Sequence, residues 1–589
     1  MRTATPLALA ALLLAAPLAQ AQVRVTDDIT TSTTWTADNE YLLDGLVFVD
    51  GNATLTIEPG TVVRGVRDDR ITTGEEASAL IIRRGSRLVA DGLNADGSVD
   101  PIIFTAEDDD LSDPDDFFPT DRGEWAGIIL LGRATTNQPT TDTQIEGIPY
   151  DSSQPVSPTN QPALFGGNDD DDDSGVIRYV SIRYSGFSIT GDEGDEIQGL
   201  TLGAVGSGTL IDYIEIFASN DDGIEWFGGT VDVKHAAVLF PFDDAFDYDM
   251  GWRGRGQFWF TLAGVDAAGR GGEHDGGDDG GDDAQPFATP VISNATYIGA
   301  GETEPDDGDG NDWAFRMRDG AGGYYFNSIF TQFPDRAIDL ENFEDAARLD
   351  SYAQFGGGLL KIENNVFWDF GRGDTFDDIS DATHSDAADD PNPGNDDDGA
   401  ADDDAFAAYL ADNNVLQDPG IYVQRDDLNS DGTPDEVTDF NPIPQNGSLP
   451  GADFSATELD DFFDEVSYVG AFEPGTGTTW LDGWSLASQG GFIDTPTEST
   501  PERGAFGLRA FPNPASGAAT VAVTLEQGEE VRVTVVDVLG REVAVLAEGT
   551  MAAGTTRLAL PTAELPAGTY LVRLAADSGV VAQKLNVVR

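Results

Sequence analysis

The sequence predicts an all-β protein in which a right-handed parallel β-helix is followed by a small β-sandwich. Three observations lead to this prediction. Short apolar segments recur through most of the chain, and each ends at Gly or Asp. An acidic six-residue pattern returns at the spacing of one coil. Residues 506–589 differ in composition and alternate apolar with polar positions.

The chain begins with the features of a secretory signal peptide. Arg2 supplies a positive charge, residues 7–18 are apolar, and residues 19–21 (AQA) form a small-x-small cleavage site. The apolar run is shorter than the roughly 20 residues that a membrane-spanning helix needs. We therefore expect residues 1–21 to be removed during export, so that the mature chain begins at Gln22.

The charge balance excludes one class of partner and leaves two explanations open. The chain has 107 acidic and 31 basic residues, a formal net charge of -76, and no Cys that could form a disulfide. Such a charge repels nucleic-acid phosphates, so we expect no nucleic-acid partner. The acidic residues indicate either a halophilic surface, screened by counterions, or calcium loops, because clustered carboxylates suit that cation.

Residues 22–489 are predicted to form the parallel β-helix. Its first coils are recognised as short apolar strands at residues 55–63, 79–90, 101–105 and 125–131. Stacked coils pair every strand with the coils above and below it, and they bury one continuous core.

An acidic pattern gives the register of the middle coils. Residues 221–226 (DDGIEW) align with residues 243–248 (DDAFDY), which follow 22 positions later, and with residues 335–340 (DRAIDL). Because side chains alternate between the two faces of a strand, the pattern separates into inward and outward positions. The inward positions hold Ile224, Trp226, Phe246, Tyr248, Ile338 and Leu340, and the outward positions hold Glu225, Asp247 and Asp339.

Acidic, Gly-rich segments interrupt the coils. Residues 167–173, 271–283, 304–312 and 374–404 are too polar for a core, and we expect them to protrude as loops. His274 is expected in such a surface loop. The sequence shows no long amphipathic helix in the body of the chain.

The outward carboxylates are the first candidate site. Glu225 and Asp247 are expected about 4.8 Å apart on adjacent coils. Like charges at that spacing raise each other's pKa values. The column therefore requires cations, protonation, high salt or arginine partners, for which Arg253, Arg255 and Arg336 are candidates.

Three interpretations of this column stay open. It is a structural or ion-binding feature, or it is a glycan-binding face on which Trp226, Trp252 and Arg253 contact the ligand. The third interpretation is a catalytic set that hydrolyses a glycosidic bond with paired carboxylates. The candidate catalytic residues are Glu225, Asp247 and Asp339.

A second candidate site is a calcium loop at residues 427–435 (DLNSDGTPD). It resembles the calcium loops of EF-hand, dockerin and thrombospondin repeats, although its twelfth position is Thr438 in place of Glu. Its flanks do not read as helices, so we expect bound calcium without an EF-hand fold. The expected ligands are Asp427, Asn429, Asp431, Asp435 and the carbonyl oxygen of Thr433.

Residues 490–505 are expected to be a linker, and residues 506–589 a small Ig-like β-sandwich. Four segments alternate apolar and polar residues between Gly and Pro, which is typical of antiparallel strands. These segments are residues 521–525, 531–536, 557–560 and 570–574.

Four motifs in residues 506–589 occur in a fixed order: FPNP at 511–514, DVLGREV at 537–543, LPAGTYLV at 565–572 and KLNVVR at 584–589. The series resembles the C-terminal sorting domain of type IX secretion substrates. The resemblance implies contact with the type IX secretion machinery, passage across the outer membrane and attachment to a surface glycolipid. Residues 176–260 and 272–276 also resemble exported bacterial β-helix proteins that are uncharacterised, which implies a fold but no activity.

Together these features predict a secreted protein on the extracellular face of the outer membrane. Its expected function is adhesion or binding of an extracellular glycan or other ligand, with calcium as a structural ion and without enzymatic activity. The rival is a polysaccharide lyase or glycoside hydrolase, because β-helices often carry these activities. Bases other than carboxylates are scarce, however, and the negative charge repels acidic polysaccharides.

Overall fold

The computed structural model describes two compact units, one of Met1–Asp109 and Phe118–Asp494 and one of Asp110–Phe117 and Thr495–Arg589. The described residues are 21–111, 116–157, 160–188, 196–266, 269–277, 281–301, 313–342, 349–382, 400–426, 436–493, 506–511, 519–525, 528–537, 541–551, 554–560, 562, 565–566, 568–576 and 579–587. The apolar part of the predicted signal peptide, the predicted calcium loop and most of the predicted linker lie outside them.

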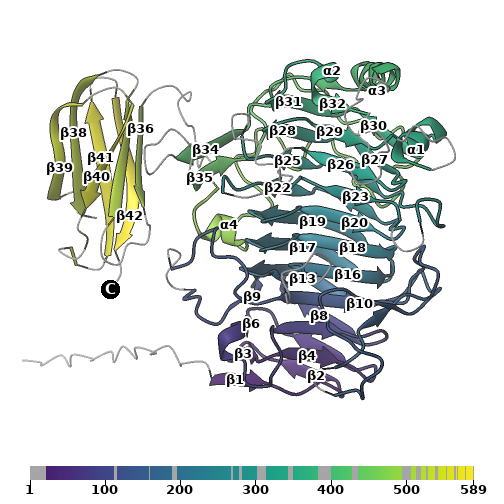
Figure 1. Ribbon diagram of the computed structural model, residues 1–589. Helices are drawn as coiled ribbons and strands as arrows, with labels where there is room; N and C mark the ends of the chain where they lie inside the picture. The colour runs from purple at the N-terminus through teal and green to yellow at the C-terminus, as the bar shows by residue number, and fades with distance from the viewer. Residues whose placement is uncertain are drawn as a thin grey trace, which may run out of the picture. The chain divides into compact units, whose positions relative to one another are not determined.

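The first unit is a parallel β-helix, as predicted, whose coils stack three columns of strands (Figure 1). We call these columns sheets one, two and three. Sheets one and two are continuous where β13 (Gly175–Arg183), β17 (Leu210–Phe217) and β19 (Asp232–Leu239) bend from one into the other. Every pairing between coils is parallel, so each strand satisfies its backbone groups with the coils above and below.

The other strands of sheet one are β2 (Thr33–Trp35), β5 (Thr54–Ile57), β8 (Arg87–Asp91), β21 (Arg255–Gln257), β24 (Val291–Ser293), β27 (Gly323–Phe326) and β30 (Leu360–Glu363). Those of sheet two are β1 (Ala21–Val25), β3 (Asn39–Leu43), β6 (Val62–Gly65), β9 (Ile102–Ala106), β22 (Phe260–Leu262), β25 (Thr296–Ile298), β28 (Ile329–Phe333), β31 (Val366–Phe370) and β33 (Val415–Leu416).

Sheet three has ten strands, which lie one above another in Figure 1. They are β4 (Leu46–Val49), β7 (Ala79–Ile82), β10 (Gly127–Leu131), β16 (Leu200–Val205), β18 (Ile224–Gly229), β20 (Phe246–Asp249), β23 (Glu273–Asp275), β26 (Phe315–Arg318), β29 (Ile338–Leu340) and β32 (Ser380–Asp381). Two short hairpins, β11 (Thr143–Gln144) with β12 (Leu164–Phe165) and β14 (Phe187–Ser188) with β15 (Glu196–Ile197), belong to insertions between the coils.

The predicted register of the middle coils is confirmed. Ile224 pairs with Phe246, and Glu225 pairs with Asp247. The inward positions are fully buried and form one continuous core along the coils. Aromatic rings fill much of this core, and Trp226 stacks on Trp252 and Trp259 at centroid distances of 4.6 and 5.1 Å. Each such pair contributes about 0.5–1.5 kcal/mol beyond the apolar area that it buries.

The bend between sheets one and two places one residue of each coil at positive φ. From β13 onward, four coils use an aromatic ring or imidazole at this position and the next three use Asn. We call this set the bend column: Tyr179, Tyr213, His235, Phe258, Asn294, Asn327 and Asn364. Asn tolerates this backbone conformation, whereas bulky side chains adopt it at a cost.

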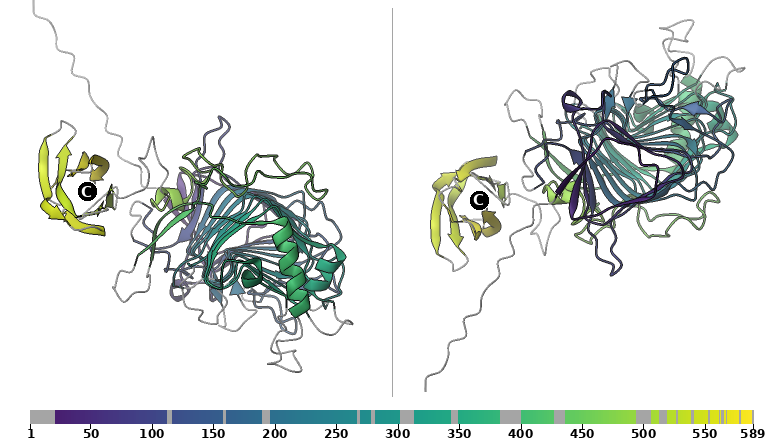
Figure 2. Two further views of the ribbon diagram at one scale, coloured as in Figure 1. Left: turned by 90° about the horizontal axis from the view of Figure 1, so that it is seen from above. Right: turned by 90° about the horizontal axis from the view of Figure 1, so that it is seen from below.

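Two sequence expectations about insertions are wrong. Glu273–Asp275, within the segment expected to protrude as a loop, forms β23, and Ser380–Asp381 forms β32. Helix α3 (Ala400–Asn413) was not expected either. It buries Phe406 and Leu410 against the last coils and lies across that end of the β-helix (Figure 2). An acidic helix with one apolar stripe covers the core that the final coil would otherwise expose.

Three shorter helices and one 3-10 turn complete the first unit: η1 (Asp68–Arg70), α1 (Ser351–Gly357), α2 (Phe376–Ile379) and α4 (Leu486–Gln489). Helix α2 begins with a reciprocal capping box between Thr375 and Asp378. None of the described helices is long and apolar enough to cross a membrane.

The sequence predicted that the β-helix continues to residue 489. The stacked strands instead end at β33. β34 (Tyr422–Asp426) and β35 (Glu436–Asn441) form an antiparallel hairpin. Residues 442–493, which we call the strap, then run back over the bend column. Asn327 exchanges hydrogen bonds with the backbone of Asp453, and Gln257 bonds the backbone of Asp464. At its far end the buried Glu215 accepts the first backbone N–H groups of α4, at 2.6 and 2.9 Å.

The second unit has two antiparallel sheets that share one apolar core. One contains β36 (Phe506–Phe511), β37 (Ala519–Leu525) and β40 (Gly554–Leu560). The other contains β38 (Glu529–Asp537), β39 (Glu542–Met551), β41 (Gly568–Ala576) and β42 (Gly579–Val587). Val523, Val533 and Val572 point inward from both sheets, as the alternating pattern predicted.

Candidate metal centre on sheet three

The outward face of sheet three carries one continuous column of side chains, one from each of ten strands. The register places these side chains directly above one another. We call them the outer column: Phe48, Ile81, Ile129, Thr201, Glu225, Asp247, Glu273, Arg316, Asp339 and Asp381. The column is apolar in its first three strands and becomes charged from Glu225 onward.

The apolar part of the outer column is covered by the chain's own insertions. Phe48, Ile81 and Ile129 pack with Ile145 and Phe165 in a second apolar core outside the coils. Ile129 is 1% exposed and Phe165 0%. The insertion between β10 and β13 therefore gives this part of the β-helix a second layer and removes its apolar face from water.

Arginine residues neutralise the far part of the outer column. Glu273 lies 2.7 Å from Arg270 and 3.0 Å from Arg318, and Arg316 lies 3.0 Å from Asp339. Arg318 also bonds Asp275 through two nitrogens. The last member, Asp381, forms an ion pair with Arg336. Glu273, Asp339 and Asp381, the outer-column carboxylates of these coils, thus each have an arginine partner.

Between these two parts lies a carboxylate cluster that forms no ion pair with any arginine of the described residues, although Arg318 is near enough to interact with the charge of Asp247. Asp222, Glu225 and Asp247 each place one carboxylate oxygen within 4.8 Å of the other two. Glu225 is 6% exposed and Asp222 7%. The buried atoms Oε2 of Glu225 and Oδ1 of Asp247 make no hydrogen bond to any described residue. These two buried carboxylate oxygen atoms therefore lie among like charges, and no described residue donates a hydrogen bond to either of them.

The electrostatics of the cluster are unfavourable for three ionised groups. Burial raises the pKa of Glu225, and the nearby carboxylates of Glu146 and Asp247 raise it further. Burial also raises the pKa of Asp222, and the charge of Asp247 raises it further. For Asp247 the largest cause is again burial, and the next is the charge of Asp275. A protein can relieve such a cluster by protonation or by a bound cation.

A stacked acidic turn borders the cluster. Asp221 and Asp243 lie beside Asp222, and the three offer carboxylate oxygens within 4.8 Å of one another. The backbone N–H of Asp244 donates to Oδ1 of Asp222 at 2.9 Å. One turn further, Asp244 accepts from the backbone of Arg270. The backbone geometry of consecutive coils thus repeats the same carboxylates at one edge of sheet three.

The donor set fits calcium. Every donor in the cluster is a carboxylate oxygen, and hard divalent cations prefer such ligands, whereas Zn²⁺ and Cu²⁺ favour nitrogen or sulfur. Calcium takes six to eight oxygen ligands in flexible geometry, so three carboxylates leave positions for water. His274 is the nearest imidazole along sheet three, and it faces the core.

Structure and sequence agree only in part on the candidate residues. Glu225 and Asp247 are adjacent, as predicted, but Asp339 lies three strands away and is paired with Arg316. Trp226 and Trp252 are fully buried, so the prediction of exposed aromatic rings beside the carboxylates is wrong. Trp226 points inward because strand alternation directs it opposite to Glu225, its neighbour in β18.

The expected arginine partners also differ. Arg253 binds Asp170 at 3.0 Å and Arg255 binds Asp232 and Asp460, all away from the outer column, whereas Arg336 reaches Asp381. The sequence interpretation missed three arginines that do neutralise the column. Arg316 and Arg318 alternate with apolar residues in their strand, which is a signal that could have found them. The missed residues are Arg270, Arg316 and Arg318.

His274 is not in a surface loop as expected. It is fully buried in β23, and its ring stacks on Tyr248 at 4.1 Å. Nδ1 lies 2.5 Å from the carbonyl oxygen of Glu273 and must donate, so Nε2 accepts from the Tyr325 hydroxyl at 2.6 Å. Burial lowers the pKa of His274 to about 3, so the imidazole is neutral at pH 7.

The second candidate site, Asp427 to Asp435, lies outside the described residues. Its flanks are described: β34 and β35 form an antiparallel hairpin, and the candidate loop connects them. Strands rather than helices therefore flank it, as the sequence predicted.

Comparisons with known proteins agree with this architecture. Residues 27–406 match the pectate-lyase-like β-helix domain, and residues 509–588 match the secretion system C-terminal sorting domain. No curated protein matches the chain. The sorting domain identifies a protein that is exported by type IX secretion and located at the cell surface or outside the cell. The first match spans well over half of the chain, which therefore belongs to the family of pectate-lyase-like β-helix domains.

Proposed function

We propose that this protein is a non-enzymatic binding protein of the cell surface, whose β-helix is held together by calcium at Asp222, Glu225 and Asp247. One observation carries the proposal: Oε2 of Glu225 is buried, has no hydrogen-bond partner among the described residues, and lies among other carboxylates. A bound divalent cation neutralises this cluster without arginine. It also links β18 and the turn before it to β20, the strand of the next coil.

Calcium explains the composition better than protonation does. Burial raises the pKa of all three carboxyl groups, so protonation can relieve part of their repulsion, but a proton does not link successive coils as a shared cation does. A cation is effective at neutral pH, where the rest of the chain is strongly negative and concentrates cations at its surface. Magnesium requires a tighter octahedron and loses its water reluctantly, so calcium is the favoured ion.

Calorimetric titration of the full mature chain with calcium tests this proposal. The titration is made at a constant high sodium concentration, so that general screening is already saturated. We expect calcium to bind more tightly than magnesium, and Glu225→Gln to weaken calcium binding. Glu465→Gln, an exposed carboxylate of the strap, is the matched control and should bind as the unchanged protein does. Equal calcium binding by the two variants would contradict the site.

The enzymatic alternative, a polysaccharide lyase or glycoside hydrolase, has less support. The family name mentions pectate lyase, but a lyase needs a base that can take a proton. The arginines nearest the cluster are all engaged by carboxylates, and His274 is in the core. Glu225 and Asp247 lie side by side on one face, whereas paired hydrolytic carboxylates flank the scissile bond. Release of new reducing ends or unsaturated uronates, abolished by Glu225→Gln, would favour the alternative.

Three further parts of the proposal concern the rest of the chain. Residues 427–435 bind a second calcium ion, the acidic surface is adapted to high salt, and the C-terminal unit is an Ig-like sandwich. The sorting domain interacts with the type IX secretion machinery. We propose that the exported protein is then attached to an outer-membrane glycolipid.

A further inference from the structure

The aromatic residues of the bend column lie between sheets one and two, away from the carboxylate cluster on sheet three. Tyr213 stacks on His235 at 4.1 Å, and His235 stacks on Phe258 at 4.9 Å. All three residues have positive φ, a conformation that is costly for large side chains. The same position holds Asn in the next three coils, which tolerates that backbone. The bend of successive coils therefore places these three rings in one stack, at a backbone conformation that is costly for large side chains.

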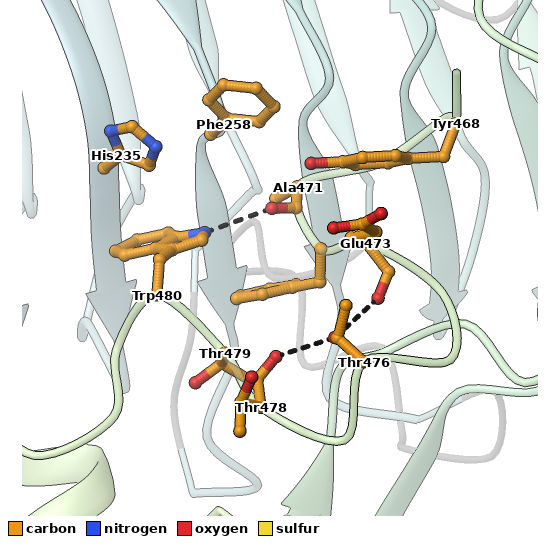
Figure 3. Close-up of a pocket in the computed structure, with 10 residues that line it drawn as sticks. His235, Phe258, Tyr468, Ala471, Glu473, Thr476, Thr478, Thr479 and Trp480 are labelled. Atoms are coloured by element: carbon orange, nitrogen blue, oxygen red, sulfur yellow. Dashed lines mark hydrogen bonds between the residues drawn. The ribbon is translucent and has the colours of Figure 1, made fainter. Parts of the chain in front are cut away.

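The strap covers only part of this ring stack. Trp480 packs edge-on against Tyr213 and His235, and Trp484 against Tyr179 and Tyr213. Beside Phe258 the strap turns away and leaves a pocket of about 260 Å³ (Figure 3). Its lining includes His235, Phe258, Tyr468, Glu473, Thr476 and Trp480.

Polar groups in the pocket are available for a ligand. The hydroxyl of Tyr468 points toward the other lining side chains in Figure 3. Neither this hydroxyl nor the carboxylate of Glu473 hydrogen-bonds another described side chain. Thr476, in contrast, is already used, because its hydroxyl bonds the carbonyl oxygens of Glu473 and Thr478. The Glu473 carboxylate, which accepts hydrogen bonds, and the Tyr468 hydroxyl, which donates and accepts them, thus lie beside aromatic rings.

From this arrangement we infer that the pocket binds one neutral sugar ring, such as the terminal unit of a glycan. A hexose has C–H faces that pack on aromatic rings and hydroxyl groups that donate to a carboxylate. The volume of about 260 Å³ lies just below the range for ligand pockets, roughly 300–1,000 Å³, so the pocket fits one ring and not a chain. Burial and Glu473 raise the pKa of Tyr468 to about 12. The Glu473 carboxylate in the lining repels the negative charge of uronates and sulfated sugars, so a neutral ring is favoured.

The inference deepens the proposed binding function by naming a ligand and its place, yet it does not depend on calcium. The pocket is formed by the bend column and the strap, whereas the proposed cation lies on sheet three. Sugar binding should therefore persist when calcium is removed. If calcium binding on sheet three fails its test, sugar binding in the pocket can still be tested, and the reverse also holds.

Saturation-transfer NMR on the full mature chain tests the inference. The probes are the methyl α- and β-glycosides of glucose, galactose and mannose, each measured with calcium and with EGTA. We expect transfer to at least one neutral glycoside in both conditions. Galacturonate and tetramethylammonium serve as anionic and cationic comparisons and should show none.

Variants then locate the binding site. Glu473→Gln and Tyr468→Phe should each weaken binding of the sugar about tenfold, because each loses one hydrogen bond of the ligand. Glu465→Gln, an exposed carboxylate elsewhere on the strap, should leave the affinity unchanged. The inference is overturned if none of the neutral glycosides binds, if only galacturonate or tetramethylammonium binds, or if both pocket variants bind as tightly as the control.

Discussion

The two parts of the outer column have the same backbone and opposite chemistry. Ile129 and Glu225 stand two strands apart in one column, and both are buried. Around Ile129 the chain supplies an apolar partner, Phe165, from its own insertion. Around Glu225 the described chain supplies Thr201 on one side and two further carboxylates, Asp222 and Asp247, on the other. The comparison shows that the coils set the position of a side chain, whereas its surroundings decide whether that position stabilises the fold or needs a cation.

The largest expected effect is on the apolar part. Phe165→Ala removes a fully buried ring of the apolar core to which Ile129 belongs and should lower the free energy of unfolding by about 3–5 kcal/mol. Chemical denaturation followed by tryptophan fluorescence measures this loss. Phe118→Ala, which truncates a ring that is 53% exposed, is the control and should change it little. Similar losses in both variants would show that the covering insertion does not stabilise the β-helix.

The next prediction concerns a substitution that gives the charged part of the outer column an apolar side chain like those of its first three strands. Without calcium, Glu225→Ile should raise the free energy of unfolding by about 1–3 kcal/mol, because a buried acceptor without a partner disappears. With calcium at about 100 times its dissociation constant, the unchanged protein should gain about 2.7 kcal/mol and the variant almost none. Denaturation in EGTA and in calcium measures both values. A calcium gain that survives in Glu225→Ile would place the stabilising ion elsewhere.

A third effect concerns the inward face of the same sheet. The pKa of His274 is about 3 in the folded protein and near 6.5 when unfolded. The unfolded chain therefore binds more protons between these values, and stability is present above pH 6.5 and lost as pH falls. At pH 5 the loss amounts to about 2 kcal/mol, since one pKa unit corresponds to about 1.36 kcal/mol.

The carboxylates of the cluster act in the opposite direction, because their raised pKa values stabilise the folded protein as pH falls. The contribution of His274 is therefore obtained as a difference from His274→Gln, which keeps an acceptor for Tyr325. Unfolding free energies at pH 5 and pH 7 should diverge between the two proteins. Parallel pH profiles would contradict the buried, neutral imidazole.

The smallest expected effect separates buried from surface charge. Raising the salt concentration from 0.1 to 1 M shortens the Debye length from about 10 to 3 Å, but buried groups are screened much less than exposed ones. The melting temperature of the whole chain should rise with salt. The difference between Glu225→Ile and the unchanged protein should shift by about 0.5 kcal/mol or less. A difference that vanishes in 1 M salt would mean that Glu225 behaves as a surface charge.

Much of the fold could be predicted because coil stacking is a local, repeating property. The 22-residue spacing of Asp221 and Asp243 and the alternation around Glu225 give the strand register directly. The prediction was less successful where packing between segments distant in the sequence determines the local structure. β23 is short and acidic, so its composition resembles a loop, yet pairing with β20 and β26 makes it a strand. The strap has no repeat of its own, and its path depends on the Asn side chains of the bend column.

The sequence by itself determined export, the parallel β-helix and the outward placement of Glu225 and Asp247, because targeting motifs and strand periodicity are local patterns. Only the tertiary structure decided which carboxylates keep a positive partner. Arg270, Arg316 and Arg318 reach Asp244, Glu273 and Asp339 because coil stacking brings them together. Among the described residues, the same stacking leaves Asp222, Glu225 and Asp247 without an arginine ion pair. It also buries Trp226 on the opposite face of the strand that holds Glu225.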